Sequence, residues 1–313
     1  MPEYDVIGLG MSVVDVAIRL ERMPTWEDPG RVSGFALADG GAAGTACYVV
    51  ATFGLQTGFI DTFGSDEMAS RKLRSLEQAG VDVSNMVRRE GPEDNIVVVY
   101  VQEQTGERSF GFSRGMWTRP VRTDELDRDY LTSARYLHLD GTHGEASIHA
   151  ARWMHEAGKT VVLDAAKTDK PVPKWQEVLV AETDVLICGS GFGTMLTGHE
   201  DIRQSGRTIL NKGPRIVVQT EGVDGSYTVT AEEEFHTPAF KVNVVDTTGA
   251  GDVFHGAYLV GLAWGWDLGK TAVFASAVSA IHCTVLGNRK GIPTIEQVDA
   301  FLRERGQARI INQ

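Results

Sequence analysis

Short runs of apolar residues recur along the chain, and segments of a different periodicity separate them. Each run ends in glycine or a polar residue, and several are nearly continuous in apolar side chains: YDVIGLG, TGFIDTFG, ARYLHLDG, TVVLDAA, TDVLICGS and RIVVQTEG. Such runs are typical of parallel strands that are covered on both faces. The pattern therefore predicts a mostly parallel β-sheet.

Between these runs, apolar side chains return at helical spacing. Residues 65–80 and 145–159 each place three apolar side chains near one face of a helix, and each segment contains a glycine near its end. A glycine in this place is a common signal for the end of a helix. Strands that alternate with such helices predict a doubly wound α/β fold, with helices on both faces of the sheet.

Two regions, 12–38 and 94–117, break this rhythm. Their strand-like runs follow one another without an intervening helix: SVVDVAIRLERMP and NIVVVYVQEQTGERSFGFSR. They predict a small separate β layer, either a lid that excludes water from a reactive site or edge strands with no moving part. No long linker divides the chain, so the simplest organisation is one domain over residues 1–313 with this lid.

Composition narrows the choice of partners. The 313 residues carry a formal net charge of -12, and 42% of them are hydrophobic. The hydrophobic share can supply a substantial core, while the negative charge argues against binding to nucleic acid or to an anionic membrane. The first residues lack the basic start of a signal peptide, and the apolar stretch around 257–266 is too short to span a bilayer. We expect a cytoplasmic protein that acts on a small molecule.

The segment FKVNVVDTTGAGDVFHGA predicts a strand, a glycine-rich turn and a helix, in that order. Gly249, Ala250 and Gly251 lack bulky side chains, so their backbone N–H groups can approach an anion at the start of the helix. Asp252 follows this cradle and, facing a second reactant, would accept a proton from an attacking hydroxyl. Alternatively, Asp252 only stabilises the first turn of its helix, and spacing alone favours neither interpretation.

DTTGAGDVFHGA resembles the second signature of the phosphofructokinase-B, or ribokinase-like, sugar kinases. The resemblance implies the ribokinase-like fold, an anion hole at residues 249–251 for the transferring phosphoryl group, and Asp252 as the general base. It implies ATP and Mg²⁺ as cofactors, and it places Asp246 and Thr248 where relatives often use a monovalent cation such as K⁺. A homodimer formed through the lid also follows from the resemblance.

Other segments match the sugar-binding side of this family in order and spacing. GMSVVD resembles the first strand and brings Asp15 to the position that binds sugar hydroxyls, where a carboxylate can accept two directional hydrogen bonds. DGGAAGTACYVVATFG resembles the first signature, in which Gly40 and Gly41 allow backbone contact with the sugar. Asp140, at the end of a predicted strand, matches the place where relatives present an acidic or polar residue toward the substrate.

The nucleotide side is matched by two further segments. TEGVDG resembles the TxGxxG loop beside the nucleotide phosphates and supplies Thr220, Gly222 and Gly225. FASAVSAIHCTVLGNRKGIP resembles the helix and loop that line the adenine pocket, with Ser276 and Asn288 as candidates. For these two residues, ordinary helix packing and a loop turn explain the sequence equally well.

Three positions depart from the family pattern. Gly44 stands where relatives usually carry an asparagine in the sugar pocket, and Gly189 and Phe192 stand at the Asn and Glu positions of the NxxE motif. That motif organises magnesium and phosphate through water. Magnesium would then be held mostly by nucleotide phosphates and water, since this ion retains water readily; weak catalysis or altered metal use is the alternative.

The resemblance covers almost the whole chain and predicts ATP-dependent phosphorylation of a sugar or sugar-derivative hydroxyl. The second signature looks especially like that of sulfofructose kinases, and Arg31 and Arg114 are lid-region candidates for holding a negative group. The arginine that those enzymes carry after the acidic strand end is Thr142 here, so we do not assign sulfofructose. The alternatives are a nucleoside kinase of the same fold, with Phe112 and Trp117 as a slot for the base, and a ligand-binding protein with a decayed kinase site.

Overall fold

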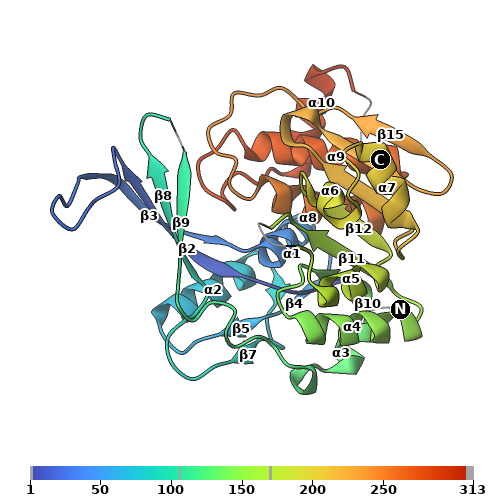
Figure 1. Ribbon diagram of the computed structural model, residues 1–313, viewed down its shortest axis with the longest axis horizontal. Coiled ribbons are helices and arrows are strands. Elements are labelled where there is room, and N and C mark those ends of the chain that lie inside the picture. The colour runs from blue at the N-terminus through green and yellow to red at the C-terminus, as the bar shows by residue number, and fades with distance from the viewer. Residues whose placement is uncertain (1–2, 106, 169–170, 308–313) are drawn as a thin grey trace.

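The centre of the molecule is a nine-stranded sheet (Figure 1). The computed structural model describes residues 3–105, 107–168 and 171–307. From one edge to the other the strands lie in this order: β15 (Glu234–Thr237), β14 (Ser226–Val229), β13 (Ile216–Thr220), β12 (Val185–Cys188), β11 (Thr160–Ala165), β10 (Ala134–Leu139), β1 (Tyr4–Leu9), β4 (Thr57–Ile60) and β6 (Val81–Asp82). Only the β13–β14 and β14–β15 pairs of this sheet are antiparallel. The prediction of a mostly parallel sheet is confirmed.

Two layers of helices cover the sheet, and neighbouring residues of a strand contact opposite layers. In β1, Val6 packs in the core beneath one layer and Ile7 in the core beneath the other. All residues of β4 and β12 are buried, which explains their continuous apolar sequences. The first layer contains α1 (Ala42–Thr52), α2 (Glu67–Gln78), α8 (Ala250–Ala263), α9 (Leu268–His282) and α10 (Ile295–Glu304). The second contains α3 (Arg128–Thr132), α4 (Gly144–Glu156), α5 (Lys174–Ala181), α6 (Phe192–Thr197) and α7 (Ile202–Leu210).

Strand order changes direction at β1. From β1 the chain continues to β4 on one side, whereas β10 to β13 extend the sheet on the other side. In open α/β sheets, ligands bind outside the carboxyl ends of the strands at such a switch point. Here these ends lead into Gly10 after β1 and Asp140 after β10.

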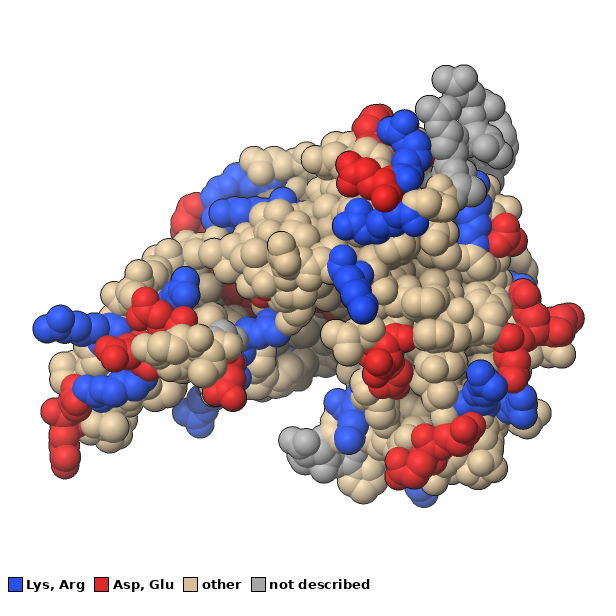
Figure 2. Space-filling model, turned by 90° about the horizontal axis from the view of Figure 1, so that it is seen from above, with Lys and Arg blue, Asp and Glu red and all other residues tan. Residues whose placement is uncertain are grey.

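A second sheet of four strands projects from one side of the core (Figure 1). Its order is β3 (Val32–Gly40), β2 (Val13–Leu20), β8 (Ile96–Gln102) and β9 (Arg108–Phe112), with only β2 and β8 parallel. We call it the lid sheet. The lid sheet is built from the two regions in which strands did not alternate with helices in the sequence. The molecular surface is hollowed where the lid sheet meets the body of the molecule (Figure 2).

The lid sheet is attached to the core through a buried ionic cluster. The carboxylate of Asp61 accepts hydrogen bonds from the Ser12 N–H at 2.8 Å, just before β2, and from the Asn95 amide at 3.4 Å, just before β8. Lys72, from α2, donates to Glu93 Oε1 at 2.7 Å and lies 3.8 Å from Asp61 Oδ2. Lys72 and Asp61 have no exposed side-chain surface. This cluster fixes where both strands leave the core.

The remaining short elements are a pair of parallel strands, β5 (Thr62–Phe63) and β7 (Val87–Arg88), and two 3-10 turns, η1 (Thr123–Glu125) and η2 (Gly222–Asp224). The strand predicted immediately before the glycine-rich turn is wrong, because residues 238–249 form no strand. Val245 and Asp246 donate their N–H groups to the Cys283 carbonyl instead. Within the described ranges, no helix has both the length and the apolar character needed to cross a bilayer.

Candidate active site

The N-terminus of α8 provides an open anion cradle. Gly249 is the N-cap, with φ of 75°, and no side chain caps the helix. A side chain at Gly249 would need a strained backbone and would collide with the Asn288 side chain. The Gly251 N–H has no acceptor within the described part of the chain, and the space around its Cα is open. The Gly251 N–H can therefore bind an anion, whereas the Ala250 N–H donates to the Thr247 carbonyl at 3.2 Å, so an anion hole over residues 249–251 stays a prediction.

Asp252 lies in the first turn of α8, directly after the cradle, and is half-buried. Burial, followed by the nearby Asp164 carboxylate, raises the pKa of Asp252 to about 7, against the opposing effect of His255. A carboxyl group with this pKa is ionised in a substantial fraction at neutral pH and is still basic enough to accept a proton. The local geometry suits a general base.

One helical turn further along α8, His255 contacts a second carboxylate. Its Nδ1 lies 2.6 Å from Asp164 Oδ2, at the carboxyl end of β11, and both side chains are nearly buried. Although burial opposes it, the Asp164 carboxylate raises the pKa of His255. The sequence reasoning missed this pair. Its one signal was an acidic residue at the end of a predicted strand.

Asp15 and Gly40 meet beside the cradle, where the lid sheet joins the core. Asp15 is 8% exposed, and burial raises its pKa to about 6 against the opposing charge of Arg289. A Cβ at Gly40 would collide with Asp15 Oδ2 and would lie 2.7 Å from Asn288 Nδ2. Gly41, next in the chain, is the N-cap of α1. The predicted sugar-binding residues Asp15, Gly40 and Gly41 are thus brought together.

Asp140 holds the backbone around this group. Its Oδ2 accepts hydrogen bonds from the N–H groups of Met11 at 2.7 Å and Ala43 at 3.2 Å, and its Oδ1 accepts from Thr142 at 2.9 Å. Burial raises the pKa of Asp140, while these bonds oppose that rise. The carboxylate connects the ends of β1 and β10 to the start of α1 at the switch point. The structure therefore gives Asp140 an orienting role, and contact with substrate stays a prediction.

Arg289 explains the departure at Gly44. Its guanidinium is buried beside the sugar-side residues, where Nη2 donates to the Gly40 carbonyl at 2.9 Å and Nη1 to Ser75 at 2.9 Å. A Cβ at Gly44 would lie only 3.1 Å from Arg289 Nη2 and 2.8 Å from Ser12 Cβ. A larger side chain at position 44 would therefore press against Ser12 and against a guanidinium from the C-terminal part of the chain. Nothing in the local sequence predicted this contact.

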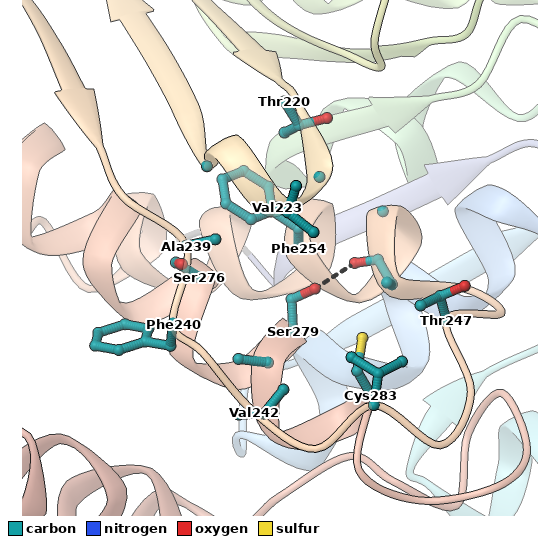
Figure 3. A pocket seen from close by; sticks show the side chains of 16 residues that line it. Thr220, Val223, Ala239, Phe240, Val242, Thr247, Phe254, Ser276, Ser279 and Cys283 are labelled. Carbon is teal, nitrogen blue, oxygen red and sulfur yellow. Dashed lines mark hydrogen bonds between the residues drawn. The ribbon is translucent and has the colours of Figure 1, made fainter.

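A pocket of about 250 Å³ opens on the other side of the cradle (Figure 3). It contains four of the five predicted nucleotide-side residues, Thr220, Gly222, Gly225 and Ser276, together with Ala250 and Gly251 of the cradle. Its remaining walls are largely apolar, with Val223, Phe240, Val242 and Phe254 visible around the cavity (Figure 3). Such walls suit a flat aromatic base. The segment mispredicted as a strand lines this pocket.

Asn288 is the exception among the nucleotide-side residues. It lies against Gly249 and Gly40 and is 4% exposed, on the side of the cradle where Asp15 is found. Asn288 does not line the pocket that contains Ser276, and its contact with the nucleotide stays a prediction. The chain turns after α9, so two residues that are close in sequence reach opposite sides of the cradle.

Comparison with known proteins agrees with this geometry. Residues 5–295 match the family model described as the pfkB family carbohydrate kinase. The chain belongs to the pfkB family of carbohydrate kinases. A 5-dehydro-2-deoxygluconokinase from Shouchella clausii is 26% identical over 324 residues, covering 97% of each chain. An aminoimidazole riboside kinase from Salmonella typhimurium is 31% identical over 299 residues, covering 90% of this chain and 92% of the relative.

The fold of this pfkB kinase also matches solved structures. A putative ribokinase II from E. coli, crystallised in complex with ATP and Mg²⁺, superposes with a TM-score of 0.82 at 22% identity. The match covers 96% of this chain and 99% of that chain. The ribokinase-like fold expected from the sequence is confirmed.

The pfkB kinase keeps neither functional side chain of the NxxE motif. Phe192 is fully buried in the core beneath α6, and a Cβ at Gly189 would meet only open space. Among the described residues, no group of three or more His, Cys, Asp or Glu side chains is arranged to hold a metal ion. The side chains at these two positions cannot take over the role of that motif.

The lid arginine that contacts the site of this pfkB kinase is not one of the two that were predicted to do so. Arg31 and Arg114 are exposed, and neither forms an ion pair within the described part of the chain. Arg108, which the sequence reasoning did not single out, instead reaches the loop before the cradle. Its Nη2 donates to Thr247 Oγ1 at 2.6 Å, and its Nη1 donates to Thr248 Oγ1 and lies 3.6 Å from Asp246 Oδ1. Some 140 residues separate these groups in sequence, so no local pattern could relate them.

Proposed function

We propose that this carbohydrate kinase transfers the terminal phosphoryl group of ATP to a hydroxyl of a sugar or sugar derivative, with Asp252 as the general base. The observation that carries the proposal is the position of Asp252. Its carboxyl group, with a pKa raised to about 7, follows an open anion cradle that separates an apolar pocket from the cluster of Asp15 and Gly40. A base at this boundary is adjacent to both reactants.

The pocket supports ATP as the phosphoryl donor. Its apolar walls can hold the adenine, while Ala250 and Gly251, the two residues before Asp252, line the same pocket. The triphosphate would then point at the N-terminus of α8, where the helix dipole and free N–H groups favour negative charge. The name of the E. coli structure, a complex with ATP and Mg²⁺, supports this choice.

Magnesium bound with ATP would neutralise charge on the phosphates. Because Gly189 and Phe192 provide no ligand, the protein would hold it through the nucleotide phosphates and water. The chain itself would therefore orient the two reactants and donate hydrogen bonds to them, and phosphoryl transfer depends mainly on these two contributions.

In the proposed reaction, Asp15 accepts hydrogen bonds from hydroxyls of the sugar and orients it across from the cradle. The acceptor hydroxyl forms a bond to the terminal phosphorus as the bond from that phosphorus to ADP breaks. Asp252 takes the proton of the hydroxyl, and the N–H of Gly251 stabilises the negative charge on the transferring group. The products are ADP and a sugar phosphate.

A screen of ADP release with wild-type protein and Asp252→Asn tests this function. The panel contains sugars, polyols, acidic sugars and nucleosides. We expect at least one substrate whose turnover falls by at least ~10²-fold in the variant, the lower range for loss of a general base. The variant should still bind ATP, measured by calorimetry, because the pocket does not include the Asp252 side chain. Equal turnover by the two proteins would reject Asp252 as the base.

A nucleoside or riboside acceptor is the second candidate, favoured by the 31% identical aminoimidazole riboside kinase. The predicted base slot does not support it. The rings of Phe112 and Trp117 contact each other with centroids 5.2 Å apart, which leaves no gap between them for a base. The same screen separates the two candidates, since only a riboside kinase would prefer nucleosides to free sugars. The intact cradle and Asp252 argue against a decayed site.

We also propose that the kinase works in the cytoplasm as a homodimer formed through the lid sheet. All three cysteines are buried free thiols, which fits a reducing compartment. The face of the lid sheet opposite Asp15 carries apolar side chains that are only half-buried or exposed, among them Ile18, Phe35 and Tyr100. A second copy of the chain could cover this face.

A further inference from the structure

Arg108 connects the lid sheet to the loop that precedes the anion cradle. The guanidinium donates to the hydroxyl groups of Thr247, at 2.6 Å, and Thr248, and its Nη1 lies 3.6 Å from Asp246 Oδ1. The Arg108 side chain is 28% exposed and that of Asp246 is 16% exposed, so the contact is partly shielded from water. These three loop residues lead directly into Gly249. A single side chain of the lid sheet thus contacts all three residues of the loop before the cradle.

The register of the lid sheet explains why Arg108 faces the site. Arg108 pairs with Val101 of β8, which pairs with Arg19 of β2. Asp15 lies four residues before Arg19 in β2, so its side chain projects from the same face of the sheet. One face of the lid sheet therefore presents Asp15 to the sugar side and Arg108 to the phosphoryl side.

Donors already surround the carboxylate of Asp246. Its Oδ1 accepts from the Thr248 N–H at 2.9 Å, and its Oδ2 accepts from the Gly287 N–H at 3.0 Å. Burial opposes ionisation, but the hydrogen bonds and the Arg108 charge lower the pKa of Asp246 overall. The neighbouring carbonyls also have partners, since Thr248 O contacts His282 Nε2 at 2.8 Å and Cys283 O accepts two N–H groups.

This arrangement does not fit a monovalent cation at Asp246 and Thr248. Such an ion needs several oxygen ligands, and the carboxylate and hydroxyl oxygens here face the guanidinium of Arg108. The positive charge beside Asp246 already belongs to the chain. Unlike a dissolved ion, it is permanent and comes with hydrogen bonds of fixed geometry.

We propose that Arg108 is a positioning residue that serves as the built-in cation of the loop 246–248, so that the kinase does not depend on K⁺. The kinetic part of this inference rests on the proposed function. Because the guanidinium comes from the lid sheet, the loop is held in place only while the lid covers the site. Loss of Arg108 should therefore lower kcat, with little change in the KM for ATP.

The test compares wild type, Arg108→Gln and Arg108→Lys in potassium chloride and in choline chloride at equal ionic strength. Arg22→Gln is the matched control, because Arg22 also lies in the lid region but pairs with an aspartate of that region, Asp28, instead of with the loop. Both kcat and the melting temperature are measured. Melting requires no turnover, so it remains informative if the proposed function fails.

We expect wild type and Arg22→Gln to give the same kcat and melting temperature in both salts. Arg108→Gln should lose about 10-fold in kcat, the equivalent of one hydrogen bond to a charged group. Potassium should restore part of that loss and raise the melting temperature of this variant, because Asp246 then lacks its cation. Arg108→Lys should retain more activity than Arg108→Gln.

Three results would overturn the inference: activation or stabilisation of wild type by potassium, an Arg108→Gln variant as fast as wild type, or a slow variant that responds to potassium in neither measurement. Absence of turnover by wild type on every substrate would instead reject the proposed function. The melting comparison in the two salts would still decide the role of Arg108.

Discussion

At the scale of single residues, four aspartates lie near the carboxyl end of the sheet and differ in what surrounds their charge. Asp140 accepts three backbone hydrogen bonds, Asp164 contacts His255, and Asp15 lies in the field of Arg289. The Asp252 carboxylate has no hydrogen-bond donor among the described side chains and N–H groups. Asp15 likewise accepts no hydrogen bond within the described part of the chain, so what distinguishes Asp252 is its place directly after the anion cradle, with a pKa raised to about 7.

The raised pKa of Asp252 predicts the pH dependence of the reaction. The base acts in its ionised form, and burial raises its pKa from 3.8 to about 7. Activity should thus be half-maximal near pH 7, approach its full value at higher pH, and fall as Asp252 becomes protonated at lower pH. A pH profile of kcat/KM checks this, with an acid limb near pH 7.

Asp164→Asn refines the same measurement. The Asp164 carboxylate is the second cause of the raised pKa of Asp252, so its removal should move the acid limb to lower pH. A profile that stays flat down to pH 5 in the wild type would contradict the pKa given to the base. An unmoved limb in the variant would contradict the influence of Asp164.

At the scale of elements, the site depends on how two strands and one helix are held. β2 carries Asp15 and β9 carries Arg108, and both belong to a sheet whose attachment is the cluster of Asp61, Lys72 and Glu93. Glu93 also accepts the N–H groups of Gly64 and Asn95. The lid sheet is therefore positioned by fully buried charges rather than by apolar packing alone.

Lys72→Met tests the importance of this cluster. The substitution leaves Asp61 and Glu93 without their buried cation, which should destabilise the protein by about 3–5 kcal/mol. Urea denaturation measures the loss. Arg74→Met is the matched control from the same helix, because Arg74 pairs with Glu67 at the surface and should change stability by less than about 1 kcal/mol. Equal effects of the two substitutions would show that the buried cluster contributes no special stability.

At the scale of the whole molecule, the body around the nine-stranded sheet contributes the apolar pocket and the cradle, and the projecting lid sheet contributes Asp15 and Arg108. The hollow between these parts is open at the surface, and side chains of both signs are spread over the lid region (Figure 2). A sheet attached at the starts of its two inner strands has one face for the site and another face for solvent or a partner. The apolar character of that second face underlies the proposed dimer.

Phe35→Glu tests the dimer. Phe35 is 65% exposed on the edge strand β3, on the face opposite Asp15. A charge there should prevent a second copy from covering the face, because burying an unpaired carboxylate is unfavourable. Sedimentation should show a dimer for wild type and a monomer for the variant. A wild-type monomer at all accessible concentrations would reject the dimer.

Much of the fold could be predicted because its signals are local. A strand buried on both faces needs an apolar sequence, so the runs at β1, β4 and β10 to β13 could be recognised one at a time. The strand predicted before the cradle was wrong for the same reason, because that prediction also used only a local pattern. Its alternating apolar residues line a pocket instead of pairing in a sheet, and both environments favour the same local pattern.

The sequence by itself determined the cradle and its base, because Gly249 to Asp252 are consecutive and their geometry is that of one helix N-terminus. Only the tertiary structure decided what surrounds them. It brought Arg108 to Asp246, placed Arg289 beside Gly44, paired His255 with Asp164, and set Asn288 against Gly40 and Gly249. These contacts join residues far apart in the chain, and their charges and pKa values depend on burial and neighbours that exist only after the layers have packed.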